Sequence, residues 1–130
     1  MEKSVYLPKG YQAAGVACGI KKNGKRDLAL ITSDIPAVAA GVLTRNVVKG
    51  HSLKWSMEHT QTNPAKAIVI NSGNANACVG PAGDADAARF AASTAKLFGC
   101  PGEQVLLGST GVIGYRLPME KIEAGIKEAF

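Results

Sequence analysis

The sequence predicts an α/β fold in which helices rich in small residues pack on a sheet. Hydrophobic residues make up 46% of the 130 residues, and many of them are alanine. Glycine occurs 15 times, whereas aromatic residues contribute only 5%. Short β-rich runs and two segments with helical periodicity share the chain. This length supports one ordinary core, so residues 1–130 are expected to form a single domain.

The first half of the chain is predicted to form three short strands in an antiparallel meander. Gly15–Ile20 and Leu28–Ser33 flank Asn23-Gly24, a dipeptide typical of hairpin turns. Asp34–Pro36 is predicted to turn the chain, and Ala37–Thr44 is the third expected strand.

Helices and strands are predicted to alternate in the second half. Ser52 is a suitable cap for a helix that runs to about Thr60 and ends at Asn63-Pro64. The fully apolar run Ala67–Ile70 predicts a buried strand, and the polar segment Asn71–Asn76 is expected to form a loop after it.

The clearest helix is expected to open at Asp84, as the cap, with Asp86 in its first turn. Gly99 is expected to stop this helix. Its predicted packing face consists of Ala88, Ala91, Ala92, Ala95, Leu97 and Phe98.

A last strand and a last helix complete the prediction. Val105–Leu107 is expected to be a strand, with Gly108–Gly111 as the loop after it, and Pro118 suits the start of a helix. An apolar face of this helix is formed by Met119, Ile122, Ile126 and Phe130. We expect that face to remain uncovered and to mark an interface.

Charge and cysteine content exclude several classes of function. The net charge is +5, but the dense basic cluster around Asn23-Gly24 is expected to be a solvated hairpin tip, so no nucleic-acid partner is predicted. The charge instead favours anionic small substrates. Cys18, Cys78 and Cys100 lack metal-site spacing and are expected to be buried free thiols. His51 and His59 also lack that spacing, and surface or capping roles are predicted for both.

The start of the chain lacks the apolar region of a signal peptide. The longest apolar stretch, Ala37–Leu43, is too short to span a bilayer. We therefore expect a cytoplasmic protein without a membrane partner.

Two glycine-containing polar segments each follow an apolar strand: Asn71–Asn76 and Gly108–Gly114. Backbone N–H groups in such segments can converge on an anionic oxygen. The residues alone favour the simpler interpretation of two tight turns. Gly108–Gly111 is one residue short of a nucleophile elbow and lacks the ending of a phosphate-binding loop.

Five segments carry a more specific signal: Gly15–Lys21, Asp27–Ile31, Ala40–Thr44, Asn71–Cys78 and Ser109–Gly114. Together they resemble the ornithine acetyltransferase (glutamate N-acetyltransferase) family of arginine biosynthesis, and the resemblance covers nearly the whole chain. Leu117–Met119 also fits the family pattern, whereas the region after Arg45-Asn46, through His51 to Trp55, departs from it.

This resemblance implies a fold, a reaction and partners. Family members form a layered α/β sandwich and cleave themselves into two chains. The cleavage exposes a threonine that carries acetyl from N-acetylornithine to glutamate, and some members also use acetyl-CoA. The resemblance assigns oxyanion stabilisation to Thr110 and Gly111. No other cofactor and no metal are expected.

The threonine nucleophile is not found in these residues. We therefore expect a shortened N-terminal portion, inactive alone, that pairs with the downstream β-chain region in an oligomer of α and β chains. Two alternatives remain open: a self-processing aminopeptidase of similar fold, and a non-catalytic domain that binds small molecules.

Overall fold

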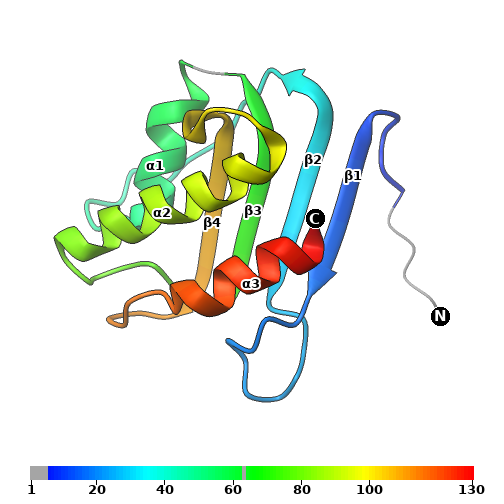
Figure 1. Ribbon diagram of the computed structural model, residues 1–130. Coiled ribbons are helices and arrows are strands. Elements are labelled where there is room, and N and C mark those ends of the chain that lie inside the picture. Colours follow the sequence, from blue (N-terminus) through cyan, green and yellow to red (C-terminus); the bar gives the residue numbers. More distant parts are fainter. Residues whose placement is uncertain (1–5, 63) are drawn as a thin grey trace.

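A four-stranded sheet forms the centre of the computed structural model, which describes residues 6–62 and 64–130 (Figure 1). The strand order follows the chain, from β1 at one edge to β4 at the other. Helices α2 and α3 cover one face of the sheet, and α1 lies beside β4. The strands are β1 (Tyr11–Val16), β2 (Leu28–Ala37), β3 (Ala65–Asn74) and β4 (Val105–Val112). The helices are α1 (His51–Thr60), α2 (Pro81–Phe98) and α3 (Met119–Ala129), with a short 3-10 helix at Gly102–Gln104.

The sheet is mixed, which confirms the predicted α/β class. Strands β1, β2 and β3 pair antiparallel, whereas β3 and β4 pair parallel and are joined through α2. The predicted third strand, Ala37–Thr44, is wrong: β2 continues through Asp34–Pro36 to Ala37, and no strand follows before α1. The antiparallel partner of β2 is instead β3, so a helix interrupts the expected meander. β1 also ends at Val16 rather than Ile20.

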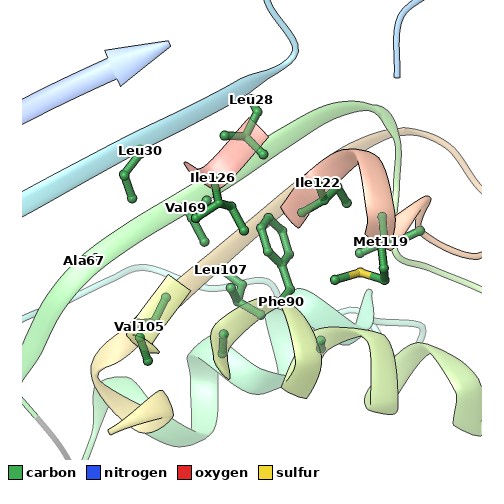
Figure 2. Close-up of a cluster of buried hydrophobic side chains, with 14 residues drawn as sticks. Leu28, Leu30, Ala67, Val69, Phe90, Val105, Leu107, Met119, Ile122 and Ile126 are labelled. Carbon is green, nitrogen blue, oxygen red and sulfur yellow. The ribbon is translucent and has the colours of Figure 1, made fainter. Parts of the chain in front are cut away.

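Alternation along the strands sends large apolar side chains to the face under α2 and α3. Val69 and Val105 are fully buried there, and they pack with Leu30 and with Phe90 of α2 (Figure 2). The buried face of α2 includes Ala87 and Phe90, which the alanine pattern did not single out, while Ala92 is exposed.

Helix α3 corrects the expectation of an uncovered helical face. Met119, Ile122 and Ile126 are buried in the core, because α3 lies across β1 and β2 and beside α2 (Figures 1 and 2). Only Phe130 remains exposed, and its ring meets Phe98 edge-on at a centroid distance of 5.2 Å.

The open apolar surface lies on the other face of the sheet. Ile31, Ile70 and Leu106 are only half-buried there, and Ile68 is exposed. Register places these four side chains on neighbouring strands β2, β3 and β4. A contiguous apolar surface of this kind usually marks an interface.

Helix α1 closes part of the free edge of β4. The Ser56 hydroxyl accepts a hydrogen bond from Leu107 N (2.8 Å) and lies 2.9 Å from Leu107 O, to which it can donate. The Trp55 indole N–H donates to Val105 O at 3.0 Å. These contacts satisfy backbone groups that a sheet edge would leave unpaired.

The predicted helix boundaries need two corrections, both at N-termini. Gly50, not Ser52, is the N-cap of α1, and Ser52 is buried inside the helix. The helix ends at Thr60, as predicted; of the predicted stop Asn63-Pro64, Asn63 lies outside the described residues. Helix α2 begins at Pro81 rather than Asp84, whereas Gly99 ends it in the left-handed conformation as predicted.

The three cysteines are free, but they are not all buried: Cys18 and Cys100 are half-buried and Cys78 is exposed. Burial and the neighbouring Asp27 raise the pKa of the Cys18 thiol to about 11, so its thiolate is scarce at neutral pH. Within the described residues, no helix combines the length and apolar character needed to cross a membrane.

Asp27 organises the long connection between β1 and β2. Its carboxylate accepts the backbone N–H groups of Cys18 (2.7 Å), Ile20 (2.7 Å) and Lys21 (2.8 Å). Burial by itself would raise the pKa of Asp27, but these donors outweigh it and hold the pKa below its ordinary value. The connection therefore depends on one ionised carboxylate.

Replacing Asp27 with asparagine is expected to lower the free energy of unfolding at pH 7 by about 1.5–3 kcal/mol, the usual contribution of hydrogen bonds to a charged group. Because the pKa is lower in the folded state, the stabilisation is present above the ordinary carboxyl pKa of about 3.9 and is lost as pH falls through the folded pKa. Urea unfolding at several pH values measures this. The difference between wild type and Asp27→Asn should shrink on acidification, and a constant difference would contradict the assignment.

Candidate functional site

The two polar segments singled out in the sequence lie side by side. Parallel pairing aligns Ser72 with Thr110 and Gly73 with Gly111. Both segments begin as strand rather than loop, because β3 extends to Asn74 and β4 to Val112. The carboxyl ends of two parallel strands therefore meet at one end of the sheet, where α/β proteins commonly bind ligands (Figure 1).

Gly111 allows the two strand ends to approach each other closely. Its φ is +129°, a conformation that residues with a Cβ rarely adopt. A Cβ at this position would overlap the carbonyl carbon of Gly73 and would lie 2.6 Å from its oxygen. Only glycine therefore fits this position without movement of β3.

Both sequence-predicted site residues, Thr110 and Gly111, are exposed. Their neighbour Ser109 is anchored: its hydroxyl lies 3.1 Å from Asn74 O, as donor, and accepts the Asn76 backbone N–H at 2.8 Å. Thr110 and Gly111 are therefore accessible, and the hydrogen bonds of Ser109 hold the strand end from which they project.

The backbone of β4 forms hydrogen bonds on both sides of the strand. Leu107 directs its backbone groups outward to Ser56, whereas Val112 O accepts from Ala75 N (2.8 Å) on the β3 side. Gly111 lies between these two residues, and its φ of +129° departs from regular strand geometry.

Three asparagine side chains, which the sequence indicated only as polar loop residues, hold this end of β3. Asn71 Nδ2 donates to Asn74 O and Asn74 Nδ2 donates to Arg116 O, both at 2.7 Å. Asn76 is buried, and its Nδ2 donates to Gly83 O in α2 at 2.9 Å. Carboxamides suit this task because one group can bond backbone in irregular conformations. The available signal was their repetition within Asn71–Cys78, a segment that also carries the family resemblance.

His51 and the two aspartates of α2 do not have their predicted roles. His51 is buried, and its Nδ1 lies 2.6 Å from Asp84 Oδ1, so neither residue is a free surface group or a cap. The hydrogen bond from His51 holds the pKa of Asp84 below its ordinary value. Asp86 is buried and forms a two-pronged ion pair with Arg116, at 2.6 and 3.1 Å.

The site offers no evident metal ligands. Within residues 6–62 and 64–130, no three His, Cys, Asp or Glu side chains are grouped closely enough to hold a metal ion. The groups that it does present are hydroxyls, carboxamides and backbone N–H groups, which suit an uncharged or anionic oxygen-containing ligand.

Known sequences match this chain over nearly its whole length. The sequence model of the ArgJ family matches residues 12–130. The arginine biosynthesis bifunctional protein ArgJ of Thermotoga neapolitana is 50% identical over 96% of this chain. The protein of the same name from Mycolicibacterium paratuberculosis is 46% identical over 97%. The chain spans about a third of the length of these relatives, 32% and 33% respectively.

Two solved structures share the fold of this chain and 40–44% of its aligned residues. Ornithine acetyltransferase from Mycobacterium tuberculosis, crystallised with ornithine, superimposes with a TM-score of 0.90 at 44% identity. That match covers 94% of this chain and 66% of the solved one. The ArgJ protein of Bacillus halodurans gives a TM-score of 0.87 at 40% identity, covering 92% and 63%. With a family match that extends from β1 to Phe130, this chain belongs to the ArgJ family.

Proposed function

We propose that this chain is the N-terminal part of an acetyltransferase that moves acetyl from N-acetylornithine to glutamate through an acetyl-threonine intermediate. The threonine is supplied by polypeptide outside these residues. The observation that carries the proposal is the exposed Thr110-Gly111 pair at the joined ends of β3 and β4, in a chain of the ArgJ family.

Thr110 and Gly111 suit the stabilisation of an oxyanion. Acyl transfer places negative charge on the carbonyl oxygen when the tetrahedral intermediate forms. The Thr110 hydroxyl can donate to that oxygen, and the backbone N–H of the exposed Gly111 is proposed as a second donor. Prepositioned donors of this kind contribute about 2.7–4 kcal/mol each in a well-studied enzyme.

The nucleophile and the remaining substrate contacts belong, in this proposal, to the downstream region of the same precursor. The open sheet face of Ile31, Ile68, Ile70 and Leu106 is the surface that this region would cover. Covering it would complete a layered sandwich, with α and β chains held together as an oligomer. The net charge of +5 favours anionic substrates such as glutamate, and acetyl-CoA is proposed as an alternative acetyl donor in the cytoplasm.

Residues 1–130 alone are expected to transfer no acetyl from N-acetylornithine to glutamate, because the nucleophile is absent. Addition of the downstream polypeptide should restore transfer. Product formation is measured for the chain alone, the downstream part alone and the mixture. Turnover by the isolated chain, or no transfer by the complete polypeptide, would refute the proposal.

The alternatives predict other results in the same assay. A self-processing aminopeptidase would hydrolyse peptide amides and leave glutamate unacetylated. A binding domain would retain N-acetylornithine or glutamate without converting either, even with the downstream part present.

A further inference from the structure

A buried histidine joins three segments next to the Thr110-Gly111 pair. The His51 backbone N–H donates to Asn76 O at 2.8 Å, in the segment that follows β3. Its ring nitrogen Nδ1 lies 2.6 Å from Asp84 Oδ1 in the first turn of α2. His51 is 6% exposed, whereas the Asp84 side chain is 60% exposed. A buried imidazole therefore bonds to a carboxylate at the protein surface.

The ring of His51 is also held by contact with Gly83. A Cβ on Gly83 would overlap His51 Cδ2 and would lie 2.5 Å from Nε2 and 2.6 Å from Cγ. Gly83 thus lets the imidazole lie directly against the backbone of α2. The same residue accepts the Asn76 Nδ2 hydrogen bond through its carbonyl oxygen, at 2.9 Å.

These contacts continue to β4. The Asn76 backbone N–H donates to Ser109 Oγ at 2.8 Å, and Ser109 immediately precedes Thr110. Hydrogen bonds therefore connect Asp84, His51, Asn76 and Ser109 in series. The start of α1, the start of α2 and the ends of β3 and β4 share this connection.

We infer that His51 is a positioning residue, which acts with Asp84 to hold Asn76 and Ser109 and, through them, Thr110 and Gly111. The imidazole bonds to Asp84, not to either of the two proposed oxyanion donors. Its role is to fix the strand end from which they project, because small displacements of such donors strongly reduce their effect on the transition state.

The kinetic part of this inference rests on the proposed function, whereas the structural part does not. In the complete enzyme, His51→Ala is expected to lower kcat on the order of tenfold, equivalent to about 1.4 kcal/mol, with KM little changed. His51→Asn should recover most of kcat, because its amide nitrogen can donate near the position of Nδ1. Amide hydrogen exchange at Asn76 and Ser109–Gly111 should become faster in His51→Ala.

A matched control separates this effect from the general loss of a side-chain hydrogen bond on α2. Arg89, also on α2, pairs with Glu123 at 2.7 and 2.8 Å and is exposed. Arg89→Ala should therefore leave kcat and exchange at Ser109–Gly111 unchanged. If His51→Ala does not fold, Asp84→Ala takes its place, since the exposed Asp84 side chain can be removed with little loss of packing.

The measurements test the positioning role of His51 and the proposed acetyl transfer separately. Wild-type kcat and unaltered exchange in His51→Ala, or in Asp84→Ala if that variant is used, would overturn the positioning role. Lower kcat with recovery in His51→Asn and faster exchange at Ser109–Gly111 would support it. If the wild-type enzyme transfers no acetyl, the proposed function fails, and the exchange measurement still tests the positioning role.

Discussion

Thr110→Ala in the complete enzyme is expected to lower kcat by about 10²–10³, the loss seen when one principal oxyanion donor is removed. KM should change much less, because the hydroxyl interacts most strongly once the carbonyl oxygen has become negative. The exposed position of Thr110 on a strand end anchored through Ser109 makes the side chain available for this contact. Steady-state kinetics on fully processed, folded enzyme measures the effect.

The matched variant is Thr110→Ser, which keeps the hydroxyl and should retain most of kcat. Self-cleavage also passes through a tetrahedral intermediate in the proposed mechanism, so the processed fraction is quantified separately. If Thr110 only shapes the strand end, alanine would reduce stability while kcat of the folded fraction stayed at the wild-type value. That result would remove the side chain from the mechanism and leave the Gly111 N–H as the proposed donor.

Gly111→Ala is expected to destabilise the protein by about 3 kcal/mol or more, because backbone strain and steric overlap act together. The strain arises from φ of +129°, and the overlap is with the backbone of Gly73 and Asn74. Relief requires β3 and β4 to separate at their ends, so kcat of the remaining folded enzyme should fall as well. Urea unfolding and kinetics on the same preparation measure both effects.

Gly114→Ala separates the two causes. Gly114 also has a positive φ, +85°, but a Cβ there would meet no atom within 4 Å. Its replacement should cost about 1 kcal/mol from strain alone. Equal losses at the two positions would show that contact with Gly73 contributes nothing.

The class of fold could be predicted from local patterns, but the pairing of its strands could not. Leu28–Ser33 and Ala67–Ile70 have clear β-rich composition, and both lie in strands. Ala37–Thr44 has similar composition without a partner strand, and residues 38–44 are not in the sheet. β propensity measures compatibility with a sheet surface, whereas pairing depends on distant residues.

In the candidate site, too, the residues could be predicted but their spatial partners could not. Its glycines and polar residues could be located from the sequence, and the family resemblance singled out Thr110 and Gly111. That these two belong to the strand itself, opposite Ser72 and Gly73, depends on the parallel register. The partners of His51 and Asp86 lie 33 and 30 residues away, so no local pattern could reveal them. Short-range rules therefore assigned both aspartates to helix capping.

The contacts of α1 with β4 also determine where another chain could add to this sheet. A free strand edge can recruit strands from other molecules and so promote aggregation. The Ser56 hydroxyl and the Trp55 indole occupy that edge at Leu107 and Val105, and intermolecular pairing there would have to displace both. Gly111, further along the same strand, is exposed and carries the proposed oxyanion donor. An accessible donor at this position requires an end of β4 that stays open to other molecules, which a purely structural sheet would be expected to block.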